Sequence, residues 1–152
     1  MNNKNNYFII LGSDHAGYDL KEILKSYLIS MNYEVQDIGV HNKDSVDYPD
    51  IAESVVQLIN HNPKNLGILI CGSGIGMSIA ANRHNFIRAA LCFDPLSAQL
   101  SKFHNNANVL CLGSRIIGES LAKACVDSFL NTEFEGGDRH IRRLKKLEKH
   151  NN

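Results

Sequence analysis

Residues 66–78 read LGILICGSGIGMS and join an apolar run to a glycine-rich turn. The run Leu66 to Ile70 predicts a buried strand, and Met77 to Arg83 predicts a short helix of small side chains. Between them, the glycines let the backbone approach a ligand closely and point successive N–H groups inward. The turn is therefore predicted to hold an anion, either a phosphate or a developing oxyanion.

The same alternation of apolar runs and helical periodicity extends in both directions from this turn. Apolar runs predict further strands at 7–11, 33–38, 88–92 and 108–112, and helical spacing predicts helices at 18–31, 50–60, 95–104 and 116–130. Strands that alternate with helices are typical of a parallel sheet covered on both faces. The fold class is therefore predicted as α/β, with five parallel strands.

Both ends of the chain differ from this pattern. Residues 1–6 are polar and Asn-rich and are predicted to be a disordered tail, so that one domain spans 7–152. Near the other end, residues 138–149 predict a basic C-terminal helix whose Ile141, Leu144 and Leu147 are spaced by three. This apolar stripe must pack on the chain's own body or on a second subunit.

Composition excludes several classes of protein. Lys and Arg total 16 and Asp and Glu total 16 in a chain of 152 residues, a balance that argues against a general nucleic-acid binder. No apolar run approaches the roughly 20 residues of a membrane span, and the N-terminus does not resemble a signal peptide. We expect a cytoplasmic protein with neither nucleic acid nor membrane as partner.

The four cysteines are expected to play different roles. Cys71 opens the glycine-rich turn, where the start of a helix favours a thiolate that can act as base or nucleophile. Cys92, Cys111 and Cys125 are expected to be small buried hydrophobic residues. Because the chain has no Cys-x-x-Cys pair and no close Cys/His pairs, we predict no disulfides and no zinc or other metal.

Further candidates follow the ends of strands, where parallel sheets bind ligands. Asp14 and His15 come after the first strand, although Asp14 also fits a helix cap. Arg115 directly follows the fifth strand. Tyr48 suits either a packing aromatic or a ligand contact.

Two more pairs of candidates lie on helices. His104 and Asn105 end the helix that follows the fourth strand, where a polar C-cap is the alternative interpretation. Arg139 and Arg143 are four residues apart and share one helix face. Paired guanidinium groups suit a phosphate dianion, and a solvated basic face is the alternative.

Together these residues resemble ribose-5-phosphate isomerase type B, in the sugar-phosphate isomerase family that includes allose-6-phosphate and galactose-6-phosphate isomerases. The resemblance extends from Phe8 to about Leu147. The matching stretches are Gly12-Ser13-Asp14-His15-Ala16-Gly17, Asp47-Tyr48-Pro49, Cys71-Gly72-Ser73-Gly74-Ile75-Gly76, Ser97-Ala98-Gln99-Leu100-Ser101, His104-Asn105-Asn106-Ala107-Asn108-Val109-Leu110, Gly113-Ser114-Arg115 and Glu135-Gly136-Gly137.

The resemblance implies a Rossmann-like three-layer α/β/α sandwich that works as a homodimer, or a tetramer, with active sites at the subunit interface. It implies reversible conversion of an aldose phosphate into a ketose phosphate through an enediolate, with no cofactor. Ribose 5-phosphate and ribulose 5-phosphate, of the pentose phosphate pathway, are the default pair. Allose 6-phosphate would need a slightly roomier pocket.

The resemblance also implies a role for each matching residue. Cys71 matches the catalytic base, and His104 matches the residue that opens the sugar ring. The family's loop that holds the enediolate corresponds here to Gly72, Ser73, Gly74, Ile75 and Gly76. The residues that contact the sugar correspond to Asp14, Tyr48 and Asn105, with Asp14 at the catalytic centre. The residues that bind the phosphate correspond to His15, Arg115, Arg139 and Arg143.

The chain departs from the family pattern at two positions. Some members carry a Glu where this chain has Met77, so the chain resembles the cysteine type. The family usually runs Gly-Gly-Arg-His, whereas here Asp138 precedes Arg139, and Arg142 could take one of the two arginine roles.

Two alternatives from other classes remain open on the residues alone. A non-catalytic module could bind an anion or a nucleotide through the same glycine-rich turn. A thiol redox protein could be built around Cys71, but it would need a resolving thiol, and none lies near in sequence.

Overall fold

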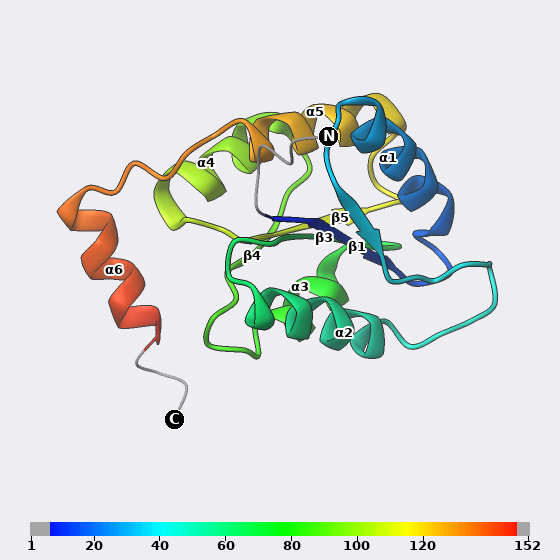
Figure 1. Ribbon diagram of the computed structural model, residues 1–152, viewed down its shortest axis with the longest axis horizontal. Helices are drawn as coiled ribbons and strands as arrows, with labels where there is room; N and C mark the ends of the chain where they lie inside the picture. Colours follow the sequence, from blue (N-terminus) through cyan, green and yellow to red (C-terminus); the bar gives the residue numbers. More distant parts are fainter. Residues whose placement is uncertain (1–6, 149–152) are drawn as a thin grey trace.

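The computed structural model describes residues 7–148, in which strands and helices alternate along the chain (Figure 1). The strands are β1 (Ile9–Ser13), β2 (Val35–Asp37), β3 (Leu66–Cys71), β4 (Ala89–Leu91) and β5 (Val109–Gly113). The helices are α1 (Tyr18–Ser30), α2 (Tyr48–His61), α3 (Ile75–Ala81), α4 (Pro95–Asn105), α5 (Glu119–Leu130) and α6 (Asp138–Glu148). The predicted tail of residues 1–6 and the predicted helix end at residue 149 lie outside the described residues.

All five strands are parallel, in the order β2-β1-β3-β5-β4. Helices α1, α4 and α5 cover one face of the sheet, and α2 and α3 cover the other (Figure 1). This arrangement confirms the predicted three-layer α/β/α fold with five parallel strands. It also confirms the predicted buried strands at β1, β3 and β5, whereas the edge strand β4, predicted to be buried, is only partly buried.

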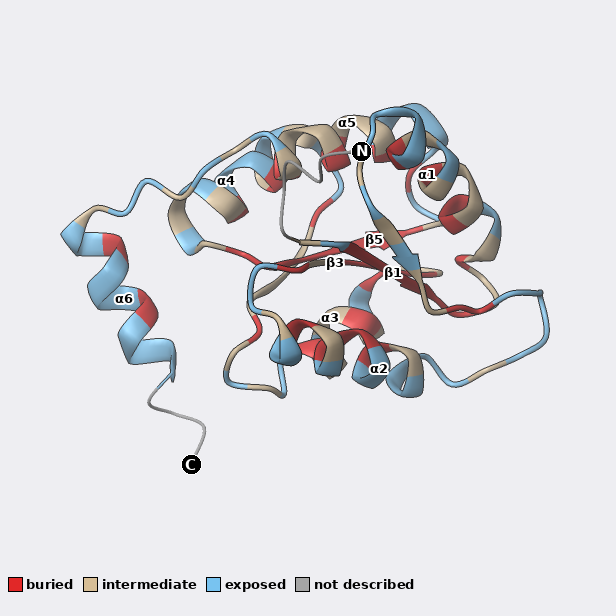
Figure 2. Cartoon of the chain, in the orientation of Figure 1, coloured by how far each residue is buried: buried red, intermediate tan, exposed pale blue. Residues whose placement is uncertain are grey.

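The central strands form the core because their side chains alternate between two apolar layers. In β3, Ile68 and Ile70 point into the layer under α1, α4 and α5, while Leu69 and Cys71 point into the layer over α2 and α3. Figure 2 shows this burial along β1, β3 and β5, together with the inner sides of the covering helices. The three central strands therefore give the chain a rigid frame.

Several predicted boundaries were wrong, each for a local reason. The strand predicted at 33–38 pairs with β1 only through Val35–Asp37, at the edge of the sheet. The helix predicted from 50 begins at Tyr48, because Pro49 fits the first turn, where its missing N–H costs nothing. The helix predicted from 116 begins at Glu119, since the amides of Ile116 and Ile117 both donate to the Gly113 carbonyl in a turn.

Helix α6 stands apart from the three layers. It projects beyond α4, the element with which it makes most contact, and Figure 2 shows most of its surface exposed. Of its predicted apolar stripe, Leu144 is buried, whereas Ile141 and Leu147 are exposed. No helix of the described residues has the length and apolar character of a membrane span.

Candidate functional site

The carboxyl ends of the three central strands lie level with one another. Ser13 of β1 pairs with Ile70, and Cys71 of β3 pairs with Gly113 at the end of β5. The loops that follow these strands therefore meet at one edge, where they form a cavity of about 520 Å³. Its lining comprises Asp14, Tyr48, Cys71, Gly72, Ser73, Ile75, Gly76, Ile79, Arg115 and Ile116.

The turn after β3 folds around the sulfur of Cys71. The Gly74 amide donates to Cys71 Sγ at 3.1 Å, and Gly74 adopts a left-handed conformation, with φ of 77°. The Ile75 amide donates to Ser73 Oγ at 3.2 Å. A backbone donor therefore faces the sulfur, and Cys71 lies where the buried layer over α2 and α3 meets the cavity.

The other three cysteines have a different environment. Like Cys71 they are buried, but unlike Cys71 none of them lines the carboxyl-edge cavity. Burial raises the pKa of the Cys92 and Cys111 thiols and raises that of Cys125 to about 11. These are the properties of small core residues, as predicted for Cys92, Cys111 and Cys125.

Asp14 and His15 are fixed by neighbouring backbone. Asp14 Oδ1 accepts from the Gly17 amide at 3.0 Å in the turn before α1. The N-cap of α1 is Gly17 and no side chain caps the helix, so the helix-cap alternative for Asp14 was wrong, and the residue lines the cavity. His15 Nδ1 accepts from the Val46 amide at 3.3 Å. The neutral ring must therefore carry its proton on Nε2, which can donate to an acceptor such as a phosphate oxygen.

Tyr48 and Arg115 close the cavity by packing against glycines. A Cβ on Gly76 would lie 2.6 Å from the Tyr48 ring, so only glycine admits this contact. The Arg115 guanidinium lies against Gly72, and the Arg115 amide donates to the Gly72 carbonyl at 2.9 Å. The loops after β3 and β5 are thus joined at the position of the predicted phosphate ligand.

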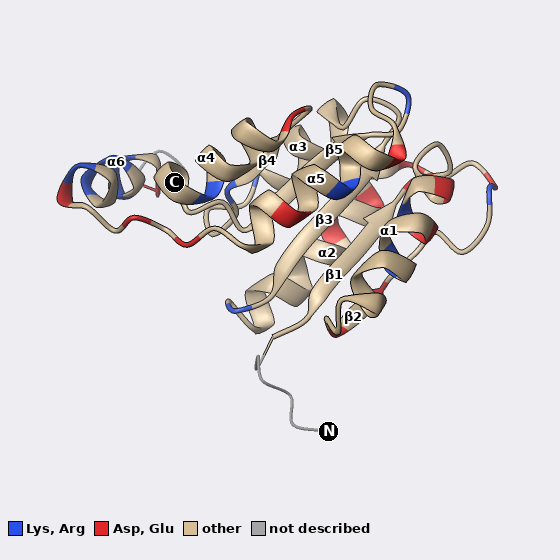
Figure 3. Ribbon diagram, turned by 90° about the horizontal axis from the view of Figure 1, so that it is seen from above, with Lys and Arg blue, Asp and Glu red and all other residues tan. Residues whose placement is uncertain are grey.

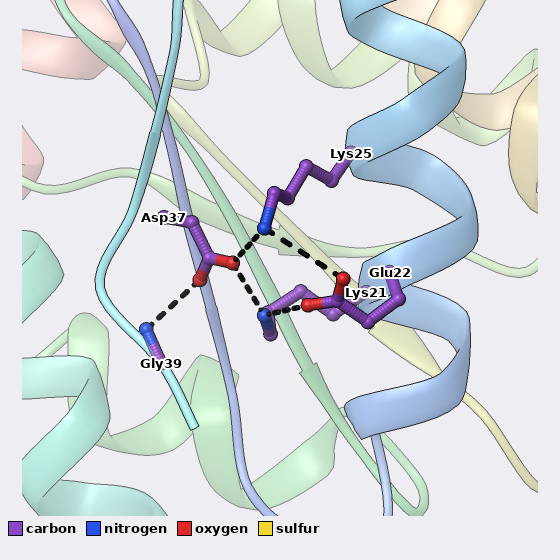
Figure 4. Close-up of polar contacts among 5 residues, drawn as sticks. All are labelled: Lys21, Glu22, Lys25, Asp37 and Gly39. Atoms are coloured by element: carbon purple, nitrogen blue, oxygen red, sulfur yellow. Dashed lines mark hydrogen bonds and ion pairs between the residues drawn. The ribbon is translucent and has the colours of Figure 1, made fainter. Parts of the chain in front are cut away.

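A partly buried ionic network, shown in Figure 4, holds the start of the loop that leads to Tyr48. Lys21 Nζ, fully buried, lies 2.7 Å from Asp37 Oδ2 and 2.8 Å from Glu22, and Lys25 also reaches Asp37. Asp37 Oδ1 accepts from the Gly39 amide at 2.9 Å. Burial raises the pKa of Asp37, but the hydrogen bonds from Lys21, Lys25 and Gly39 outweigh it and hold that pKa below its usual value.

The remaining predicted residues lie at the other end of the molecule. Helix α4 begins beyond the carboxyl end of β4 and runs back, so His104 and Asn105 lie near the amino end of β5. Arg139 and Arg143 are exposed on α6. In Figure 1 the loop before α2 and helix α6 lie at opposite ends of the protein. None of these four residues lines the carboxyl-edge cavity.

His140, for which the sequence predicts no role, lies beside His104. Their rings stack at a centroid distance of 4.8 Å and an interplanar angle of 14°. His140 Nε2 lies 2.9 Å from Glu135 Oε2 and 3.3 Å from Nη2 of Arg139. A buried histidine on an otherwise exposed helix was not detectable from helical spacing alone.

Among the described residues, His104, Glu135 and His140 are the group that could supply metal ligands, with ligand atoms within 4.8 Å of one another. The lone pairs of two nearly parallel stacked rings do not converge on one ion. The Arg139 guanidinium beside His140 also repels a cation. The arrangement fits a hydrogen-bonded stack better than a metal site.

Comparison with known proteins connects this geometry to a family. Residues 9–147 match the model of the protein family described as Ribose/Galactose Isomerase. The chain is 44% identical to ribose-5-phosphate isomerase B of Escherichia coli over 139 residues, which is 91% of this chain and 93% of that protein.

Solved structures agree. A ribose 5-phosphate isomerase of Thermotoga maritima aligns with a TM-score of 0.90 at 52% identity, over 94% of this chain and 97% of that one. Ribose-5-phosphate isomerase B of Mycoplasma genitalium, solved with bound ribulose-5-phosphate, aligns with a TM-score of 0.92 at 42% identity, over 95% and 96%. The predicted resemblance is confirmed, and the chain belongs to the Ribose/Galactose Isomerase family.

Proposed function

We propose that this protein interconverts ribose 5-phosphate and ribulose 5-phosphate, as an aldose–ketose isomerase. The observation that carries the proposal is the cavity at the carboxyl edge, which Cys71 and Asp14 line together and where an amide of the glycine-rich turn donates to Cys71 Sγ. Membership of the family supports the same reaction, as does the likeness to the Mycoplasma genitalium protein that binds ribulose-5-phosphate.

The chemistry requires a base, an oxyanion site and an anchor for the phosphate. The Cys71 thiolate takes the proton from C2 of the open aldose, the C1=C2 double bond forms, and the carbonyl oxygen O1 becomes the oxyanion. Amides of the turn 72–76 and the Ser73 hydroxyl stabilise that charge. A proton passes from O2 to O1 and the proton on sulfur is delivered to C1, which gives the ketose. No electrons leave the substrate.

The residues proposed for ring opening and phosphate binding lie at both ends of the molecule. Ribose 5-phosphate is mainly a closed ring, and the imidazole of His104 has one nitrogen that can donate a proton and one that can accept one, as opening the ring requires. His15 and Arg115, near the cavity, with Arg139 and Arg143, on α6, form the proposed phosphate set. Since α6 and the cavity lie at opposite ends of one chain, a single copy does not bring these groups together.

We therefore propose a homodimer in which the end of α4 and helix α6 of one copy complete the cavity of the other. Figure 3 shows Lys and Arg gathered on α6, which suits an anionic substrate. Exposed apolar side chains lie on the elements that would meet: Ile75 and Ile79 on α3, Leu96, Leu100 and Phe103 on α4, and Ile141 and Leu147 on α6. Covering such residues favours association.

The decisive experiment is a coupled assay of the purified protein with ribose 5-phosphate and allose 6-phosphate in parallel. We expect turnover of ribose 5-phosphate and a much lower kcat/KM for allose 6-phosphate. A preference for allose 6-phosphate would reassign the sugar within the same chemistry. Binding of both sugars without turnover would instead support the non-catalytic module.

A further inference from the structure

His140 is a buried histidine on a helix whose surface is otherwise mostly exposed. Its side chain is 8% exposed, whereas Arg139 and Ile141 on either side of it are exposed. Apart from Leu144, it is the one buried residue of the described part of α6. A polar ring in such a position calls for an explanation beyond helix packing, which Leu144 already supplies.

The ring of His104 is oriented by other rings. It stacks on His140 with an angle of 14° between the planes, and it contacts the Phe103 ring at a centroid distance of 5.3 Å. Neither ring nitrogen of His104 hydrogen-bonds to another described residue. Both nitrogens therefore remain available for a substrate, and stacking is the contact that restrains the ring without occupying them.

The stack is tied to the rest of the chain at two points. The Glu135 amide donates to the Phe103 carbonyl at 3.0 Å, which joins the segment before α6 to the residue preceding His104. The Glu135 carboxylate lies 2.9 Å from His140 Nε2. Glu135 thus connects the backbone of α4 to the His140 ring. His140 is held by the Glu135 carboxylate at its edge and by the His104 ring on its face.

We propose that His140 is a positioning residue for His104: its ring, anchored by Glu135, holds the His104 imidazole in the orientation that opens the sugar ring. This inference rests on the ring-opening role proposed for His104. Removing the stack lets the His104 ring turn about its side-chain bonds, so a smaller fraction of molecules holds the reactive orientation. Loss of an aromatic stack of this kind should slow ring opening about 3- to 10-fold.

A competing explanation is that His140 acts through its other neighbour. Arg139 Nη2 lies 3.3 Å from His140 Nε2, so loss of His140 could disturb phosphate binding instead. The two explanations differ in the reactions they affect. Phosphate binding serves both directions of the isomerisation, whereas ring opening serves only the closed aldose.

The two substrates separate these effects by their own chemistry. Ribulose 5-phosphate cannot close a five-membered ring, because the oxygen at C5 carries the phosphate. Its exchange of carbon-bound hydrogen for deuterium from solvent needs the base and the phosphate site but no ring opening. The experiment therefore measures the conversion of ribose 5-phosphate and, separately, solvent-deuterium exchange into ribulose 5-phosphate by NMR.

The proteins compared are the wild type, His140→Gln, His104→Ala and the double variant, with Lys145→Gln as a matched control on the exposed side of α6. We expect His140→Gln to slow ribose 5-phosphate conversion about 3- to 10-fold and to leave exchange within about twofold. In the His104→Ala background, His140→Gln should have no further effect. His140→Phe, which keeps a ring to stack, should lie nearer the wild type than His140→Gln.

Three outcomes would overturn the proposal. Equal losses in conversion and exchange would show that His140 acts on phosphate binding or assembly. An undiminished effect of His140→Gln in the His104→Ala background would show that it does not act through His104. Full conversion by His104→Ala would remove the ring-opening role of His104 itself, a failure of the proposed function that His140→Gln alone would not produce. Thermal melting and size-exclusion chromatography of every variant identify any that fail to fold or associate.

Discussion

The candidate residues at the two ends of this protein lie on structural elements that are packed very differently. At the carboxyl edge, Cys71 and Asp14 directly follow or end strands that are buried on both faces, and the loops there bind one another. At the other end, Arg139 and Arg143 lie on a helix that contacts chiefly the end of α4. One chain therefore positions the proposed base, whereas Arg139 and Arg143 would reach a cavity only in the proposed homodimer, where a second copy supplies them.

The largest expected effect is on the base. Cys71→Ser should lower kcat for ribose 5-phosphate by at least about 100-fold, a typical contribution of a general base, and should leave binding of the sugar phosphate intact. Cys92→Ser, at a buried cysteine that is not part of the cavity lining, is the matched control and should retain activity. Turnover by Cys71→Ser near the wild-type rate would contradict the assignment. The coupled assay and a binding isotherm measure both quantities.

Mixing two inactive variants tests whether the two ends really cooperate between copies. Cys71→Ser and Arg143→Ala are each expected to be impaired alone. If a site takes Cys71 from one copy and Arg143 from the other, random exchange of subunits should restore about a quarter of wild-type activity. Sites built within one chain would gain nothing from mixing. Activity is followed after unfolding and refolding the two variants together, with each variant treated alone as the control.

A smaller effect is expected where the two carboxyl-edge loops touch. A Cβ on Gly113 would lie 2.6 Å from the Ser73 carbonyl oxygen, so Gly113→Ala should displace the turn and destabilise the fold by about 1–3 kcal/mol. Gly118→Ala, where a Cβ meets nothing within 4 Å, should change stability by less than about 1 kcal/mol. Urea unfolding compares the two. Equal stabilities would mean that the loops are less closely packed than their geometry indicates.

The smallest effect concerns the network that anchors the loop before Tyr48. Because the pKa of Asp37 is lower in the folded protein than its ordinary value of 3.8, the charged carboxylate stabilises the fold above that value, and this contribution is lost as the pH falls through the folded pKa. Asp37→Asn should therefore be less stable than the wild type at pH 7, and the difference should shrink below about pH 4. Asp44→Asn, at an exposed position, is the control. A difference that is constant with pH would contradict the role of the Asp37 charge.

The sequence predicted the frame well because its signals are local. The apolar runs in β1, β3 and β5 and the glycines after Cys71 indicate buried strands and a close turn wherever they occur. The boundaries at Val35, Tyr48 and Glu119 were predicted less accurately. The first depends on pairing with β1, a strand distant in sequence. The other two depend on local geometry: a proline in the first turn of α2, and a carbonyl that accepts from two amides before α5.

By itself, the sequence determined the alternating α/β order, the separate character of Cys71 among four cysteines, and the family. Only the tertiary structure decided that the candidate residues divide into two groups at opposite ends, and that His140 stacks on His104. The physical reason is the direction of α4. A helix that runs antiparallel to its sheet carries its last residues to the edge opposite the cavity, and residue spacing along the chain contains no record of that distance.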